Sequence, residues 1–140
     1  MGSNDLRKAV AERAGRVCEY CRSQEKYSPD PFAIEHIIPT SKRGENSIDN
    51  LAYSCQGCNS FKYNHIEGVD PANGNIASLF NPRIQSWDEH FTWNDGYSEI
   101  IGLTPTGRAT IERMKLNRHG VINLRKVLFR AGLHPPVLQF

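Results

Sequence analysis

Hydrophobic positions in the first half of the chain predict a helix, two short strands and a second helix. Apolar residues recur at helical spacing over residues 4–14, and Gly15 can end that helix. Residues 32–38 and 51–54 are short apolar segments bounded by loop-forming residues, which predicts two strands that pair with each other. A helix over residues 56–64 is expected to follow the second strand directly.

The second half of the chain predicts a hairpin and two further helices. Residues 91–93 and 99–101 flank Asn94-Asp95-Gly96, a combination that strongly favours a β-hairpin. A helix is expected over residues 105–117, because a proline favours the first helical position, and the last helix is expected over residues 121–131. Strands and helices in this order indicate an α+β protein.

Length and composition describe one globular domain. The chain has 140 residues, of which 39% are hydrophobic and 23% charged. No segment approaches the roughly 18 consecutive apolar residues of a membrane helix. Residues 1–15 are polar and charged, which predicts no secretory signal and a cytoplasmic location. We expect a single domain over residues 1–140, with its core at about 16–66 and a C-terminal extension at about 67–140.

The charge is unevenly distributed along the chain. Residues 105–140 carry seven Lys or Arg and one Glu, a net charge of +6, whereas the whole chain carries only +2. A basic last quarter beside an acidic first part suggests a polyanion that docks on one side of the molecule. A solvated basic helix surface is the alternative interpretation.

All four cysteines lie in two CxxC pairs, which predicts a structural zinc site. Without a secretory signal the thiols of Cys18, Cys21, Cys55 and Cys58 stay reduced, so metal binding is favoured over disulfides. Thiolates bind Zn²⁺ tetrahedrally, and a CxxC turn lets both sulfurs face one ion. The alternative is a set of unrelated buried cysteines. The 33 residues between the pairs suggest an inserted functional element.

Within this insertion, Glu35 and His36 are the first candidates for chemistry. Neighbouring residues on an ideal strand point to opposite faces, so both can act at one site only if the strand bends or a metal sits near its edge. A core histidine beside a surface glutamate is the alternative. Asn50 and Asn59 follow at suggestive distances and favour the functional interpretation.

Three segments together resemble the core of the HNH endonucleases: Glu35-His36-Ile37-Ile38-Pro39, Asn50-Leu51 and Cys55-x-x-Cys58-Asn59-x-x-Lys62. The resemblance covers about residues 18–63, which include both CxxC pairs (the zinc knuckles). It implies the ββα-metal fold, here stapled by a zinc site of four cysteines and followed by a C-terminal β-hairpin and two helices. The region from Leu79 to Thr110 resembles the C-terminal part of small bacterial HNH proteins, but there it implies no residue roles.

The resemblance implies roles for four residues. His36 would be the general base, and a neutral imidazole near pH 7 can take a proton from water. Glu35 and Asn59 would hold a catalytic Mg²⁺ or Mn²⁺ ion through oxygen atoms. Asn50 would hold the orientation of His36. Some family members carry a further histidine where this chain has Tyr63, so a third side-chain ligand is missing.

Several cations are expected to contact nucleic-acid phosphates, with a solvated surface position as the alternative for each: Lys62, Arg83, Arg113, Arg118 and Arg125. Lys42 and Arg43, in the loop between the first two strands, are candidates for the same phosphate contacts.

The remaining aromatic and histidine residues are interpreted mainly as structural. Aromatic side chains can stack on nucleic-acid bases, but a hairpin core is the preferred interpretation for Phe80, Trp87, Phe91, Trp93 and Tyr97. His90 lies among them and is expected to pack in that core. His65 follows Asn59 by six residues and would face away from it on a continuous helix.

We therefore predict a metal-dependent DNA endonuclease that contains structural Zn²⁺ and catalytic Mg²⁺ or Mn²⁺. The alternative is a catalytically inactive, zinc-stapled nucleic-acid-binding module, but the full set of catalytic residues favours an enzyme. A structural zinc protein that binds another protein would not explain Glu35 and His36. No membrane partner is expected. One active site per chain nicks one strand, so cutting both strands would need a homodimer or a larger complex.

Overall fold

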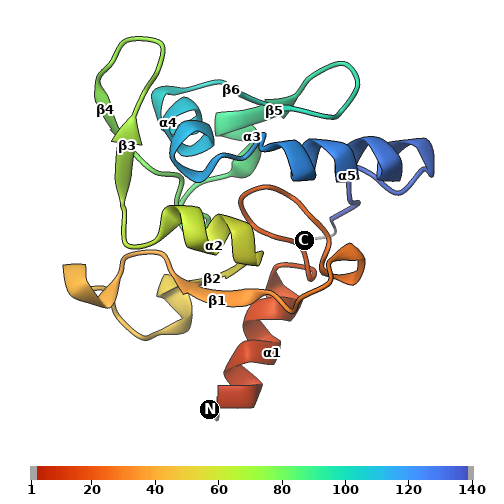
Figure 1. Cartoon of the computed structure of the whole chain (residues 1–140). Coiled ribbons are helices and arrows are strands. Elements are labelled where there is room, and N and C mark those ends of the chain that lie inside the picture. Colours follow the sequence, from red (N-terminus) through yellow and green to blue (C-terminus); the bar gives the residue numbers. More distant parts are fainter. Residues whose placement is uncertain (1–2, 139–140) are drawn as a thin grey trace.

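The computed structural model describes residues 3–138, which fold into three small antiparallel hairpins and five α-helices (Figure 1). In chain order the elements are α1 (Ser3–Arg13), β1 (Ala33–His36), β2 (Leu51–Ser54), α2 (Gln56–Lys62), β3 (Glu67–Val69), β4 (Ile76–Ser78), α3 (Trp87–His90), β5 (Phe91–Trp93), β6 (Ile100–Gly102), α4 (Pro105–Met114) and α5 (His119–Arg130). Single 3₁₀ turns lie at Glu25–Tyr27, Thr40–Lys42 and Ile48–Asn50. The α+β class is confirmed.

The predicted strand–strand–helix core is present. β1 and β2 pair antiparallel in a register that places Ala33 opposite Ser54 and His36 opposite Leu51. α2 starts immediately after β2, and the sulfur of Cys55 accepts a hydrogen bond from the backbone N–H of Cys58 at 3.5 Å. The helix therefore begins inside the second CxxC pair, as the sequence predicted.

The hairpin and the two helices predicted for the second half are also confirmed. β5 and β6 pair antiparallel with Trp93 opposite Ile100. Thr104 caps α4 by accepting the N–H of Gly107 at 3.0 Å. α4 ends before the predicted residue 117, because Lys115 takes a left-handed conformation at φ 49° and donates its N–H to the carbonyl of Ile111.

The β3–β4 hairpin and the short helix α3 were not predicted. Each of these strands has only three residues, and β3 contains Gly68, a residue type that is unfavourable in strands. Packing favours a glycine here, since a Cβ at Gly68 would lie 3.2 Å from the carbonyl oxygen of Ala109 in α4, which is a tight contact. The hairpin is thus defined by its contact with α4.

One cluster of buried side chains joins the two halves of the chain, because it includes residues from Val10 to Leu116. The indole of Trp87 is 6% exposed and donates a hydrogen bond to the carbonyl of Tyr20 at 3.0 Å. Phe91 packs edge-on against Phe80 with the ring centres 5.3 Å apart. The core interpretation of these aromatic residues is confirmed, except that Tyr97 is 38% exposed.

His90 also has a structural environment. Its Nδ1 lies 2.6 Å from the hydroxyl of Thr104, and its ring packs against Phe80. The backbone of His90 also packs closely against Gly107, and a Cβ on Gly107 would lie 2.1 Å from the carbonyl oxygen of His90. No helix among residues 3–138 is long and apolar enough to cross a membrane.

Candidate functional site

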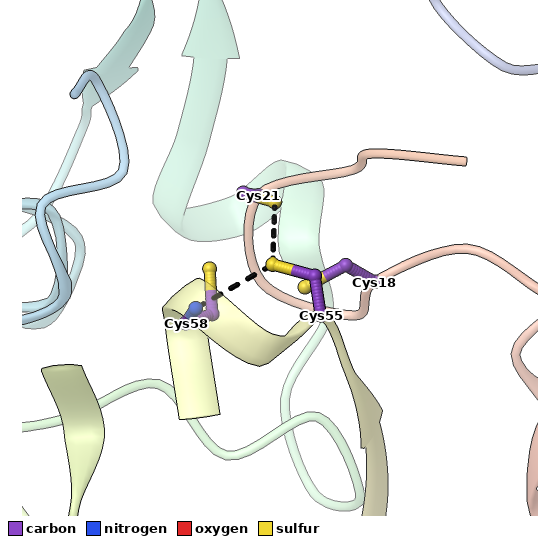
Figure 2. A group of neighbouring side chains, drawn as sticks. All are labelled: Cys18, Cys21, Cys55 and Cys58. Carbon is purple, nitrogen blue, oxygen red and sulfur yellow. Dashed lines mark hydrogen bonds between the residues drawn. The ribbon is translucent and has the colours of Figure 1, made fainter. Parts of the chain in front are cut away.

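The four cysteines form one compact, buried cluster (Figure 2). Cys18 and Cys21 come from the loop after α1, whereas Cys55 and Cys58 come from the start of α2. Their sulfur atoms all lie within 4.8 Å of one another. The sulfurs of Cys21 and Cys55 are 3.7 Å apart.

These positions fit a tetrahedral zinc ion. With Zn–S bonds of about 2.3 Å, tetrahedral geometry places the sulfurs about 3.8 Å apart, close to the Cys21–Cys55 separation of 3.7 Å. The donor set is entirely sulfur and entirely buried, as expected for a closed structural site rather than an open catalytic one. Burial raises the pKa of Cys18, whereas hydrogen bonds from neighbouring thiols, first that of Cys18, lower the pKa of Cys21.

The first knuckle is shaped by its own backbone and held against β2. The N–H of Cys18 donates to the carbonyl of Ser23 at 2.8 Å, and the N–H of Arg22 donates to the carbonyl of Cys18 at 3.1 Å. Glu19 then binds the outer edge of β2: its N–H donates to the carbonyl of Tyr53, and its carboxylate accepts the N–H of Tyr53 at 2.8 Å. These hydrogen bonds attach the first CxxC loop directly to the β1–β2 hairpin.

His36 lies at the end of β1 and is half-buried. Its Nε2 atom is 3.0 Å from Oδ1 of Asn46, a residue of the loop between β1 and β2. If Oδ1 is the acceptor, Nε2 carries the proton and Nδ1 keeps a free lone pair. In that tautomer the ring has one nitrogen able to take a proton from water.

Asn50 fixes the backbone immediately after His36. Its Oδ1 accepts the N–H of Ile38 at 2.9 Å, and its Nδ2 donates to the carbonyls of Ile38 at 2.9 Å and Glu45 at 2.8 Å. Its own carbonyl accepts the N–H of Ile37. A buried residue that satisfies four backbone groups holds this loop against the end of β1.

Glu35 points to the opposite side of β1 from His36, into the interior, where it is 4% exposed. One carboxylate oxygen lies 2.5 Å from the ammonium of Lys62, and the other accepts the hydroxyl of Tyr20 at 2.6 Å. Burial raises the pKa of Glu35, and the charge of Lys62 opposes that rise. Tyr20 is a member of the network that the sequence did not indicate.

The expected divalent-metal ligands, Glu35 and Asn59, come from the neighbouring elements β1 and α2. Asn59 is half-buried and lies about one helical turn before Lys62. Because the carboxylate of Glu35 is already occupied by Lys62 and Tyr20, the pair does not fit a divalent ion in this arrangement. Glu35 and Asn59 would hold one only after the ammonium of Lys62 moved away.

A family model described as HNH endonuclease matches residues 18–65. This segment belongs to the HNH endonuclease family. The match includes both zinc knuckles, β1, β2 and α2, and hence all the site residues described so far. Neither the curated proteins nor the solved structures compared with the chain include a significant match.

Two of the cations expected to contact nucleic acid are buried in the protein interior, which corrects their interpretation. Lys62 is 1% exposed, and besides Glu35 it donates to the carbonyl of Ile37 at 2.8 Å. Arg125 is 3% exposed, and its guanidinium donates to the carbonyls of Leu116 and Cys21 at 2.7 and 3.2 Å. Neither side chain is free to face a phosphate, because backbone and carboxylate oxygens of the protein already bind it.

Arg83 and Arg118 are also engaged within the HNH domain and its extension. Arg83 pairs with Glu19 and donates to the carbonyl of Leu51 at 3.0 Å, so it clamps the extension onto the edge of β2. Arg118 reaches the sulfurs of the cysteine cluster. Of the five predicted phosphate contacts, Arg113 has an exposed side chain.

Arg113 is part of a basic surface cluster, defined as Lys42, His65 and Arg113, that the sequence did not identify as a unit. Lys42 donates to the carbonyl of Asn64 at 2.8 Å, which brings the β1–β2 loop to the end of α2. α2 ends at Lys62, so His65 lies beyond the helix and beside these cations. Partial burial and the charges of Arg113 and Lys42 lower the pKa of His65.

Proposed function

We propose that this protein is a DNA endonuclease that hydrolyses phosphodiester bonds, with His36 as the general base. The observation that carries the proposal is the set of hydrogen bonds by which Asn50 holds Ile37 and Ile38, directly after His36. The HNH family match over residues 18–65 supports nuclease chemistry for this segment. A half-buried imidazole held in one place can act as a general base toward water.

In this proposal the side chains around His36 have separate roles. Asn46 holds Nε2 of His36, which leaves Nδ1 to accept the proton of the attacking water. Asn50 keeps the strand end and the loop at a fixed distance from each other. Pre-positioning of this kind lowers the entropy lost on reaching the transition state.

In this proposal, Glu35 and Asn59 would hold a catalytic Mg²⁺ or Mn²⁺ ion only when Lys62 has released the carboxylate of Glu35. When bound, such an ion would stabilise the negative charge that develops on the phosphate and on the leaving oxygen. Lys62 competes for the same carboxylate, since its ammonium lies 2.5 Å from Glu35. Binding of the ion therefore requires the ammonium of Lys62 to move away from Glu35. The affinity for the ion then depends on how much more strongly Glu35 binds the ion than it binds Lys62.

The basic surface cluster of Lys42, His65 and Arg113 is the proposed docking surface for the DNA backbone. It is built from the β1–β2 loop, the segment after α2 and helix α4. Exposed cations such as Lys42 and Arg113 bind phosphates without base preference. One protomer would nick one strand, and cleavage of both strands would require a dimer or a second encounter.

The deciding experiment is the nicking of supercoiled plasmid with Mg²⁺, Mn²⁺ or neither. We expect divalent-dependent nicking by the wild type, and a loss of about 10²-fold or more in His36→Ala. His119→Ala is the matched control, because that histidine is exposed at the start of α5. Nicking that survives in a folded His36→Ala protein would contradict the role of His36.

The second candidate is an inactive nucleic-acid-binding module, favoured by the ion pair that occupies Glu35. It predicts a zinc-loaded, folded wild type that binds DNA at low salt and cleaves none with any divalent ion. The same plasmid assay therefore separates the two functions when a gel-shift measurement is run beside it.

A further inference from the structure

Arg118 brings a positive charge from the C-terminal extension to the cysteine cluster. It lies between α4 and α5, 60 residues after Cys58 in the sequence. Its Nη1 donates toward the sulfur of Cys58 at 3.5 Å, and its Nη2 donates toward the sulfur of Cys55 at 3.4 Å. Both distances are normal for hydrogen bonds to sulfur, which has a larger radius than oxygen.

The position of this guanidinium is fixed from several sides. Its Nη1 also donates to the carbonyl of Lys115 at 3.1 Å, and its central carbon lies 5.7 Å from the ring centre of Phe61. Gly57 provides the space, because a Cβ at that position would lie 2.6 Å from Nη2 of Arg118. The glycine between the two ligating cysteines thus permits the close approach.

The charge of the site explains why a cation is needed here. Four thiolates around one Zn²⁺ leave a net charge of −2, and the four sulfurs are buried. An uncompensated charge away from water is costly. Hydrogen bonds to ligand atoms from the outer shell also orient the ligands and tune metal affinity.

We propose that Arg118 is an outer-shell positioning residue of the zinc site, which donates to the thiolates of Cys55 and Cys58 and neutralises part of their charge. The C-terminal extension therefore contributes to zinc affinity although all four ligands lie in the HNH core. This role replaces the interpretation of Arg118 as a phosphate contact. The proposal does not depend on nuclease activity.

The test compares zinc affinity in Arg118→Gln, Arg118→Lys and wild type by competition with a chromophoric chelator. Removal of an outer-shell partner typically costs about 10–100-fold in metal affinity, and we expect a loss in this range for Arg118→Gln. Arg118→Lys keeps the positive charge and should therefore lose less zinc affinity than Arg118→Gln. Lys126→Gln, an exposed change on α5, should leave the zinc dissociation constant within about twofold.

A double-mutant cycle with Gly57→Ala separates this role from a general packing effect. The added methyl group should displace the guanidinium of Arg118 and so weaken zinc binding. In the Arg118→Gln background it should cause little further loss of zinc affinity. The Co²⁺-substituted proteins provide a second readout, since their thiolate-to-metal absorption should shift in Arg118→Gln and not in Lys126→Gln.

Two outcomes would overturn the proposal. One is a folded Arg118→Gln protein whose zinc dissociation constant stays within about twofold of wild type. The other is an equal loss in Arg118→Gln and Arg118→Lys, with Gly57→Ala acting independently, because the side chain would then matter for its packing and not for its charge.

Discussion

Lys62 places its ammonium 2.5 Å from the carboxylate of Glu35 in the interior of the HNH core, where both side chains are buried. The same ammonium donates to the carbonyl of Ile37, so it holds the backbone beside His36 as well. The acid expected to bind a catalytic ion is therefore already paired with a residue of the protein. Under the proposed function, a divalent ion would compete with Lys62 for this carboxylate, and that competition can be measured.

Replacement of Lys62 by methionine should leave the buried carboxylate of Glu35 without its charged partner, with only the hydroxyl of Tyr20 bound to it. Breaking a buried ion pair on one side typically costs about 3–5 kcal/mol of unfolding free energy. Mn²⁺ should restore part of that loss in Lys62→Met, because an ion that binds the folded state stabilises it. The measurement is urea unfolding at several Mn²⁺ concentrations.

The matched control for this change is Lys42→Met, which alters an exposed lysine and should respond to Mn²⁺ as the wild type does. Adding Glu35→Gln to Lys62→Met should remove the stabilisation by Mn²⁺. If Mn²⁺ stabilises the wild type and Lys62→Met equally, Lys62 does not compete with the ion.

Asn50→Ala should lower both stability and activity, since it removes three side-chain hydrogen bonds to Ile38 and Glu45. Leaving buried backbone groups unpaired costs about 1–3 kcal/mol of unfolding free energy. The released loop should also misplace His36 and so lower the nicking rate. Asn123→Ala, an exposed change on α5, is the control. Unfolding curves and single-turnover nicking rates at a temperature where both variants are folded would check this, and unchanged nicking in Asn50→Ala would remove the positioning role.

Neutralising the basic surface cluster should weaken DNA binding at all sequences. Lys42→Gln with Arg113→Gln removes two exposed cations, so the slope of log affinity against log salt should fall by about 2. The matched pair Lys126→Gln and Arg130→Gln removes the same charge from α5. Equal losses in the two pairs would indicate a nonspecific effect of net charge and contradict this docking surface.

The stability of the protein should depend on pH through His134. This histidine is 7% exposed, and its Nε2 lies 2.9 Å from the carbonyl of Tyr97. Burial lowers the pKa of His134 below 6.5, and nearby Arg125 lowers it further, although the carbonyl of Tyr97 opposes the shift. The unfolded chain then binds more protons than the folded one, so this contribution to stability is present above pH 6.5 and is lost as the pH falls through the folded-state pKa.

His134→Gln should remove this slope. The measurement is the unfolding free energy of both proteins between about pH 5 and 7.5, a window that spans the ordinary histidine pKa. The difference between the two proteins excludes the proton dependence of the zinc thiolates, which both share. A difference that does not change with pH would show that His134 titrates normally in the folded protein.

The sequence alone determined the HNH core. The CxxC pairs, the apolar segments before Pro39 and after Asn50, and the helix that starts within Cys55–Cys58 are local signals, each complete within a few residues, and the structure contains all of them. The β3–β4 hairpin was missed because its strands are short and its conformation depends on α4, which lies far along the sequence.

Only the tertiary structure decided what the cations do. A lysine or arginine is interpreted as a surface charge unless a partner is known, and the partners that bury Lys62, Arg118 and Arg125 include groups 25 to 104 residues away in the sequence. Burial of such a charge is tolerated only where acceptors converge on it. That convergence is created by packing the extension onto the HNH core, so no local pattern in the sequence could show it.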